Sequence, residues 1–210
     1  MRRALLIGGL LAAVPAPSEI IDRLVAVVGR QVITQSDVEQ EARLEAFFRR
    51  QPAPALRVDS PETQALRDRL IRQHLVEQEM EQSTFPPPEA GRLREWLEKM
   101  RPAGADPAPW NLAETDLEDY ARRQIDVERF IDQRFKPGLQ IPEGEIGDYH
   151  EKVLLPELER RGIREKPPLA EARGQIEAML IEERVNQLLD HWLEEARLRT
   201  GVRLLEAPRP

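Results

Sequence analysis

The sequence predicts a mainly α protein, a bundle of amphipathic helices with a small N-terminal β-hairpin paired to a short C-terminal strand. Three observations predict this fold class. First, 33% of the 210 residues are charged and 40% are hydrophobic, a balance that suits helices with an apolar stripe and a charged back. Second, apolar residues recur every three or four positions over long stretches. Third, β-branched residues gather near the start of the chain, and a short alternating segment lies near its end.

The hairpin is expected to comprise residues 24–28 and 32–34. Both segments are rich in β-branched residues, and Gly29-Arg30-Gln31 supplies the turn. A hairpin of two strands is marginally stable on its own, so it needs a third strand or a helix to cover it. Residues 202–205 alternate in the manner of a strand. We expect them to pair with residues 24–28.

Three helices are expected in the first half of the chain. Ser36 is a suitable N-cap for a first helix that continues to about Arg50. The segment 60–62, Ser-Pro-Glu, has the cap and the early proline that begin a second helix. Prolines at 86–88 and Pro102 bound a third, shorter helix.

Two more helices are expected before the end of the chain. A long one begins near Asp116 and ends at Pro137-Gly138. Another begins at Pro142, and Pro156 should bend or stop it, because proline lacks an amide hydrogen and crowds the preceding turn.

Residues 169–199 form the most regular amphipathic pattern of the chain. Their apolar residues repeat at spacings of three and four, while the other faces carry Glu, Arg, Gln and Asp. Gly201 is a natural C-terminal stop. We expect this helix to pack among the N-terminal helices, so that the two ends of the chain meet.

The first sixteen residues have the layout of a secretory signal. A basic start, a short apolar run and a small-residue end follow one another in order. The alternative is a frayed apolar N-terminus or a short anchor, although the run is too short to span a bilayer well. The expected organisation is a signal peptide (1–16) and a single domain (17–210), made of an N-terminal part (20–141), a connecting segment (142–168) and a C-terminal helix and strand (169–206).

Four segments carry a resemblance to a known family. They are "LVAVVGRQVITQSDVEQEARL", "LRDRLIRQHLVEQEM", "DLEDYARRQIDVERFIDQRFKPGLQIPEGEIGDYHE" and "AMLIEERVNQLLDHWLEEARLRTGVRLL". In this order they resemble the chaperone domain of the SurA family of periplasmic chaperones. The resemblance implies N-terminal helices and a hairpin joined by a C-terminal helix and strand, with one or two parvulin-type prolyl isomerase domains inserted between them.

The chain departs from that family where the isomerase domains would stand. The segment 142–168 is too short to fold as a separate domain. The family's isomerase domains also carry a Gly-Gly pair in their substrate-binding loop, and no two glycines are adjacent after residue 16. No isomerase residue is therefore carried over to this sequence.

Catalytic and metal-binding patterns are not found. The chain has no cysteine, and its net charge of −7 disfavours nucleic-acid binding as a main role. His150-Glu151 begins like a zinc-protease motif, but Leu154 stands where the second histidine must lie. His74 and His191 are expected to be satisfied or solvated side chains. We therefore expect no catalytic residue, metal or cofactor, and no stable membrane insertion after signal cleavage.

Apolar side chains on or beside loops and short helices are the candidate site. Left accessible, they could hold unfolded segments through non-directional burial, which tolerates varied sequences. The candidate client-binding residues are Phe47, Phe48, Leu56, Trp96 and Trp110. The competing interpretation is that Trp96 and one of the two phenylalanines belong to an ordinary core.

The leading hypothesis is an exported, ATP-independent chaperone of the periplasm, a holdase or folding helper without isomerase activity. Its expected partners are unfolded polypeptides, including envelope and outer-membrane protein precursors. One alternative is a dedicated adaptor or structural subunit of an envelope assembly. The other is a prolyl isomerase.

Overall fold

The computed structural model describes residues 22–58, 60–83, 85–89 and 91–205, so the predicted signal peptide lies outside the described residues. The fold is mainly α with a small antiparallel sheet, which confirms the predicted fold class. The elements are β1 (Leu24–Val28), β2 (Gln31–Thr34), α1 (Gln35–Phe48), α2 (Pro61–Gln82), α3 (Arg92–Met100), a 3₁₀ turn (Ala108–Trp110), α4 (Glu114–Phe135), α5 (Glu143–Tyr149), a π turn (His150–Leu154), α6 (Leu155–Arg160), α7 (Leu169–Thr200) and β3 (Arg203–Leu204).

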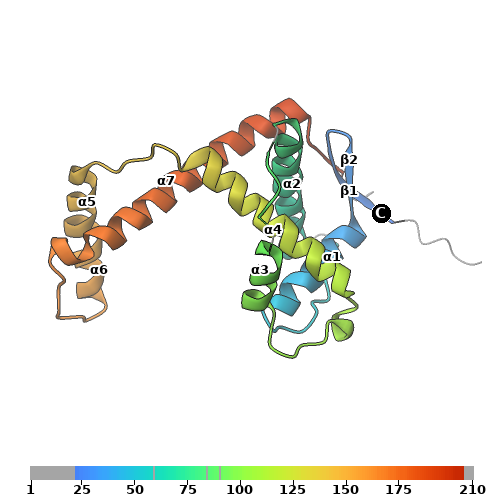
Figure 1. Ribbon diagram of the computed structural model, residues 1–210, viewed down its shortest axis with the longest axis horizontal. Helices are drawn as coiled ribbons and strands as arrows, with labels where there is room; N and C mark the ends of the chain where they lie inside the picture. Colours follow the sequence, from blue (N-terminus) through green and yellow to red (C-terminus); the bar gives the residue numbers. More distant parts are fainter. Residues whose placement is uncertain (1–21, 59, 84, 90, 206–210) are drawn as a thin grey trace, which may run out of the picture.

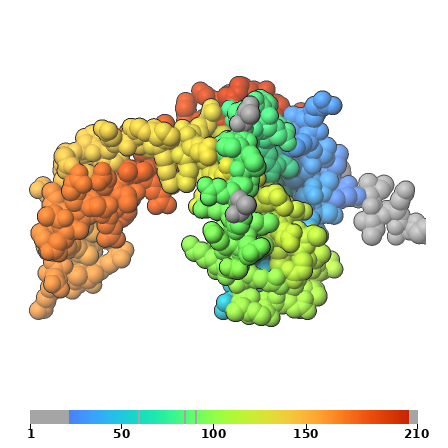
Figure 2. All heavy atoms as spheres, viewed as in Figure 1, coloured from blue at the N-terminus to red at the C-terminus, as the bar shows by residue number. Residues whose placement is uncertain are grey.

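The long helix α7 connects two parts of the molecule (Figure 1). Its C-terminal half packs against α2 and α4 in the body, which also contains the sheet, α1 and α3. Its N-terminal half packs against α5 and the π turn, which with α6 form a second lobe. Figure 2 shows an open space beneath α7, between the second lobe and the body.

The sheet has the strand order β2-β1-β3, and all its neighbours are antiparallel. Ala26 of β1 lies opposite Ile33 on one side and Leu204 on the other. Beyond β3, the Leu205 amide donates to the Val25 carbonyl oxygen at 3.0 Å. The predicted pairing of the two chain ends is confirmed.

The β1–β2 turn contacts two helices of the body. Gly29 has φ +60°, a conformation that residues with a Cβ rarely adopt. A Cβ at this position would lie 3.1 Å from Thr200 Cγ2 and 3.3 Å from Gln78 Nε2. The same Gln78 amide donates to the Val28 carbonyl oxygen at 3.1 Å. Glycine is therefore needed here for both its backbone angle and its small size.

We expect Gly29→Ala to destabilise the fold more than Gly104→Ala. Gly104 has φ +67°, and a Cβ added there would meet no neighbouring atom within 4 Å, so its substitution adds only backbone strain of about 1–2 kcal/mol. Gly29→Ala adds the same strain and also displaces Thr200 and Gln78. Urea unfolding of both variants measures the difference. Equal losses would show that the turn does not need its close approach to α2 and α7.

The helix ends follow their capping residues. The prediction that Ser36 caps the first helix is wrong, because Thr34 is the N-cap of α1 and forms a capping box with Asp37. The strand β2 therefore leads directly into α1. The predicted Ser60 cap of α2 and the predicted Gly201 stop of α7, with φ 73°, are confirmed.

The main apolar core lies between the sheet, α1, α2, α4 and the C-terminal half of α7. α7 contributes four buried residues to it, which confirms that this helix packs among the N-terminal elements. The buried members are Val25, Ala26, Val28, Ile33, Val38, Ala42, Leu66, Leu70, Ile71, Leu75, Val76, Phe130, Phe135, Val185, Trp192, Leu193 and Ala196.

Helical backbone continues past Pro156, so of the two predicted outcomes, a bend or a stop, the stop does not occur. Proline has no amide hydrogen, and its ring crowds the carbonyl four residues earlier, that of Lys152. The backbone widens into the π turn instead, and the Leu155 amide donates to the carbonyl of His150, five residues earlier. Pro156 then lies in the first turn of α6, where a missing donor is tolerated.

The second lobe has a small apolar core of its own. Ile146 of α5 and Ile141 before it pack against Ala172 and Ile176 of α7. The buried His150 ring closes one side, since its Nε2 donates to the Pro167 carbonyl oxygen at 2.9 Å. The connecting segment 142–168 is thus held against the N-terminal half of α7.

Candidate functional site

Four of the five candidate residues meet in one aromatic cluster in the body. Phe47 and Phe48 are the last residues of α1, Trp96 lies on α3 and Trp110 lies on the 3₁₀ turn. The fifth candidate, Leu56, is not brought to this cluster. It packs against the main core from the loop between α1 and α2.

Phe48 lies at the centre of the aromatic cluster. Its ring centroid is 5.2 Å from that of Phe47 and 5.3 Å from that of Trp96, both edge-on. It stacks on Tyr120 of α4 at 5.1 Å, and Phe47 contacts Trp110 edge-on at 5.4 Å. Each such pair contributes about 0.5–1.5 kcal/mol beyond its burial of apolar area.

Polar contacts fix the loop that follows α3 and carries Trp110. The Trp110 indole Nε1 donates to the Gln51 carbonyl oxygen at 2.9 Å and so ties the 3₁₀ turn to the end of α1. After α3, the Arg101 guanidinium donates to both carboxylate oxygens of Glu114, at 2.7 and 2.8 Å. It also donates to the Ala105 carbonyl oxygen at 3.0 Å. These bonds hold the proline-rich loop between α3 and α4, residues 101–113, against the start of α4.

The aromatic residues differ in their access to solvent. Phe47 is 0% exposed and packs with Leu44, Leu112 and Leu117, because it follows Leu44 by three positions on the inner face of α1. It supports the cluster from inside and offers no surface to a client. Its burial favours the competing interpretation, in which one of the two phenylalanines belongs to an ordinary core. Phe48, Trp96 and Trp110 are half-buried, so each keeps part of its ring accessible.

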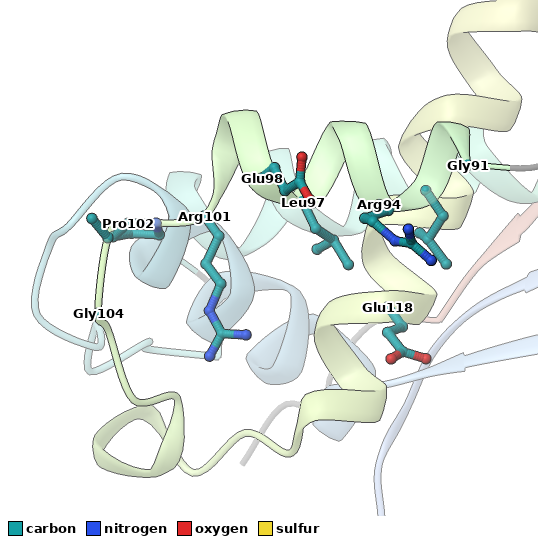
Figure 3. Close-up of a pocket in the computed structure, with 10 residues that line it drawn as sticks. Gly91, Arg94, Leu97, Glu98, Arg101, Pro102, Gly104 and Glu118 are labelled. Atoms are coloured by element: carbon teal, nitrogen blue, oxygen red, sulfur yellow. The ribbon is translucent and has the colours of Figure 1, made fainter.

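A groove of about 600 Å³ runs along one side of α3. Leu93 and Leu97 of α3 form part of its wall, together with Pro102 and Ala103 of the following loop. Figure 3 shows Leu97 pointing toward α4, and Arg94 and Glu118 entering the groove from α3 and α4. Leu97 also packs against the aromatic cluster. The groove therefore has an apolar side that is continuous with the aromatic cluster and a rim that carries positively and negatively charged side chains.

A second groove of about 540 Å³ lies on the other flank of α3. Trp96 and Met100 line it, with Arg92, Lys99 and Glu128 as charged neighbours. No residue of α3 is fully buried, so this short helix covers the cluster with both flanks open. An extended polypeptide could contact apolar side chains on either flank.

Sequence reasoning missed two members of this surface, Tyr120 and Leu97. Tyr120 follows Leu117 by three positions in the apolar pattern of α4, so the pattern already places it on the packed face of that helix. The pattern does not indicate that this face of α4 packs against α3 and against the end of α1. That meeting depends on the long loops between the helices.

The remaining chemistry of the described part of the chain is sparse. Within it, no three His, Asp or Glu side chains are placed so as to hold a metal ion. His74 Nδ1 lies 3.1 Å from a Glu77 carboxylate oxygen, and His191 is exposed beside Glu195. Among the helices of residues 22–205 that the structure describes, none is both long and apolar enough to cross a membrane.

No protein-family model matches the chain, and no curated protein matches it significantly.

Proposed function

We propose that the chain is an exported, ATP-independent chaperone that holds unfolded envelope or outer-membrane proteins in the periplasm and has no isomerase activity. The observation that carries this proposal is the half-buried aromatic group Phe48, Trp96 and Trp110. Trp96 of this group lines one open groove, and Leu97, which packs against the same cluster, lines the other. Apolar burial is non-directional, so such a surface can hold segments of many sequences. The resemblance of four segments to the SurA chaperone domain agrees with this role.

The charge distribution suits a holdase that also releases its clients. Arg94, Arg101, Glu98 and Glu118 surround the apolar floor of the larger groove. A polar rim around a modest apolar area gives weak, reversible binding, because only the centre of such a contact is fully desolvated. Weak contacts at several places would retain a client without fixing it in one conformation.

The test is suppression of aggregation with several unrelated unfolded proteins, followed by light scattering. We expect the full chain to protect more than one of them without ATP. Trp96→Ala should weaken protection several-fold, because it removes the largest accessible ring beside the second groove. Leu198→Ala is the matched control, since Leu198 is 85% exposed on α7 and lies outside the aromatic cluster.

Three other outcomes would contradict the proposal. Protection of one protein alone would indicate the dedicated adaptor. Catalysis in a protease-coupled proline isomerisation assay would indicate the enzyme. Equal losses of protection for Trp96→Ala and Leu198→Ala, in variants with unchanged melting temperatures, would show that the aromatic surface does not contribute to the suppression of aggregation.

The proposed location has a separate test. Protein recovered from a cell envelope should begin near Pro17 if residues 1–16 are a cleaved signal.

A further inference from the structure

A second candidate site lies in the body and shares α1, α4 and Leu44 with the aromatic cluster. It is an acidic pocket of about 270 Å³ between α1, α2 and α4. Five carboxylates stand in its wall against one arginine, Arg123. The wall also contains Gln40, Leu44, Leu70, Gln73 and His74, and the five carboxylates are those of Asp37, Glu41, Glu77, Asp116 and Asp119.

Hydrogen bonds fix two of the carboxylates in the wall. Asp37 accepts from the Thr34 amide at 2.8 Å, and Asp116 accepts from the Gln40 side chain at 2.9 Å and from the Ala113 amide at 2.6 Å. These bonds set the shape of the pocket without neutralising its negative charge. The carboxylates come from three different helices, so they are spread around the pocket and do not converge on a single position.

Glu41 is the unusual member of the wall. It is only 2% exposed, and its Oε1 is buried with no hydrogen-bond partner among the residues that the structure describes. Its other oxygen, Oε2, lies 3.6 Å from Arg123 Nη2. Burial raises the pKa of the Glu41 carboxyl, against the opposing effects of Arg123 and Arg69. A buried carboxylate oxygen without a partner is costly, and a cation beside it would remove that cost.

Gln73 adds a second unsatisfied group to the same wall. It is 7% exposed, and its Nε2 has no partner within the described residues. The pocket therefore offers a buried acceptor on α1 and a buried donor on α2. A basic amino-acid residue in a polypeptide meets both needs, because its side chain donates as a cation and its carbonyl oxygen accepts.

We propose that this pocket binds an organic cation, the ammonium or guanidinium group of a basic side chain, with the Glu41 carboxylate as its buried partner. The cation donates to Glu41 Oε1, and the carboxylates of Asp119 and Glu77 add to the negative charge that attracts it. The pocket has room for one long side chain and not for a folded segment. The same chemistry is shared by a lysine or arginine of a polypeptide and by a free polyamine.

The test is a titration of the full chain with small probes, followed by amide chemical shifts in NMR spectra. The probes are Nα-acetyl-lysine amide, Nα-acetyl-arginine amide and spermidine. Nα-acetyl-norleucine amide is the control ligand, because it has the four-carbon side chain of lysine without the ammonium group. We expect the cationic probes to shift amides of α1, α2 and α4 around the pocket, and the norleucine probe to leave them unchanged.

Protein variants then identify the partner. Glu41→Gln should weaken binding of the cationic probes at least tenfold, and the exposed wall variant Asp119→Asn should weaken it less. Glu195→Gln removes an equal charge from an exposed position of α7 and should leave binding unchanged. Asp119→Asn keeps the test informative if the buried Glu41→Gln variant fails to fold.

Each other result has a defined meaning. Absence of binding by all cationic probes, or equal binding to Glu41→Gln, overturns the proposal. Equal binding of norleucine overturns it too, and so does displacement of the probes by millimolar Mg²⁺, which would indicate a metal site. Binding of spermidine alone would support a free polyamine as the source of the cation. Because Trp96 does not line this pocket, these results are independent of the aggregation assays with Trp96→Ala.

Discussion

A chain that ends at Pro168 is expected to lose the cooperative unfolding of the full chain. The cut removes Val185, Trp192, Leu193 and Ala196, which are all at most 5% exposed in the main core. It also removes β3 from the sheet. A fully buried large apolar side chain contributes about 1.5–3 kcal/mol before entropy costs, so the loss is on the order of 10 kcal/mol. That is comparable with the whole net stability of a domain.

Thermal melting followed by circular dichroism measures this effect. The shortened chain should melt broadly, and addition of a peptide of residues 169–205 should restore much of the helical signal, because the α2 and α4 surfaces that receive α7 remain. A shortened chain that melts cooperatively near the temperature of the full chain would contradict the prediction. It would show that α7 is an independent appendage of the body.

Two proline variants separate the contribution of the strand from that of the helix. Leu205→Pro removes the amide that donates to the Val25 carbonyl oxygen at 3.0 Å. Successive amides of a strand point to opposite sides, so the amide of Leu204 points away from β1 and Leu204→Pro leaves that bond intact. We expect both variants to be milder than the cut, with Leu205→Pro the more harmful of the two.

The elements that sequence reasoning predicts well are those fixed by local chemistry. Ser60 and Pro61 begin α2, and Gly201 ends α7, because cap and stop residues act within one turn. The error at Ser36 arises because two caps compete. Thr34 and Ser36 are both good caps, and each is followed three positions later by an acidic residue, Asp37 and Glu39, so the local pattern does not choose between them.

The features that sequence reasoning misses depend on contacts between distant segments. Phe47 and Phe48 are adjacent and chemically identical, yet one is fully buried and the other is half-exposed, because α4 and the 3₁₀ turn cover a single face of α1. Phe47 follows Leu44 by three positions and Phe48 by four, and both spacings are typical of one helix face, so the apolar pattern does not predict which ring is covered. The partly exposed Trp96 and Trp110 reach the same cluster through loops rich in proline and glycine, whose course has no periodic pattern to predict it.

Pro156 shows a different limit, because the sequence predicts a bend or a stop of the helix at this turn and does not decide between them. The ring does exclude the ordinary hydrogen bond at this turn. Packing of Ile146 against Ile176 holds the second lobe together, however, so a widened turn costs less than an ended helix. Sequence reasoning could predict the conflict but not which of the two solutions the tertiary contacts favour.

The second large effect is expected at Trp192, where α7 meets α4. The ring is 5% exposed, and its centroid lies 5.1 Å from that of Phe130 and 6.2 Å from that of Phe135. The Arg134 guanidinium covers it at 5.6 Å. Trp192→Ala should lower the free energy of unfolding by about 3–5 kcal/mol, because it leaves a cavity in the main core. Urea unfolding measures the loss.

Trp192→Phe should be far milder than Trp192→Ala, although it also removes part of the ring. The Trp192 Nε1 is buried without a hydrogen-bond partner among the described residues, and a buried unsatisfied donor costs about 1–3 kcal/mol. Phenylalanine keeps the aromatic contacts and removes this cost. Trp110→Phe is the matched control, since it loses the hydrogen bond from Nε1 to the Gln51 carbonyl oxygen at 2.9 Å. If Trp192→Phe costs as much as Trp192→Ala, the indole donor is satisfied in solution, and ring volume alone holds α7 against α4.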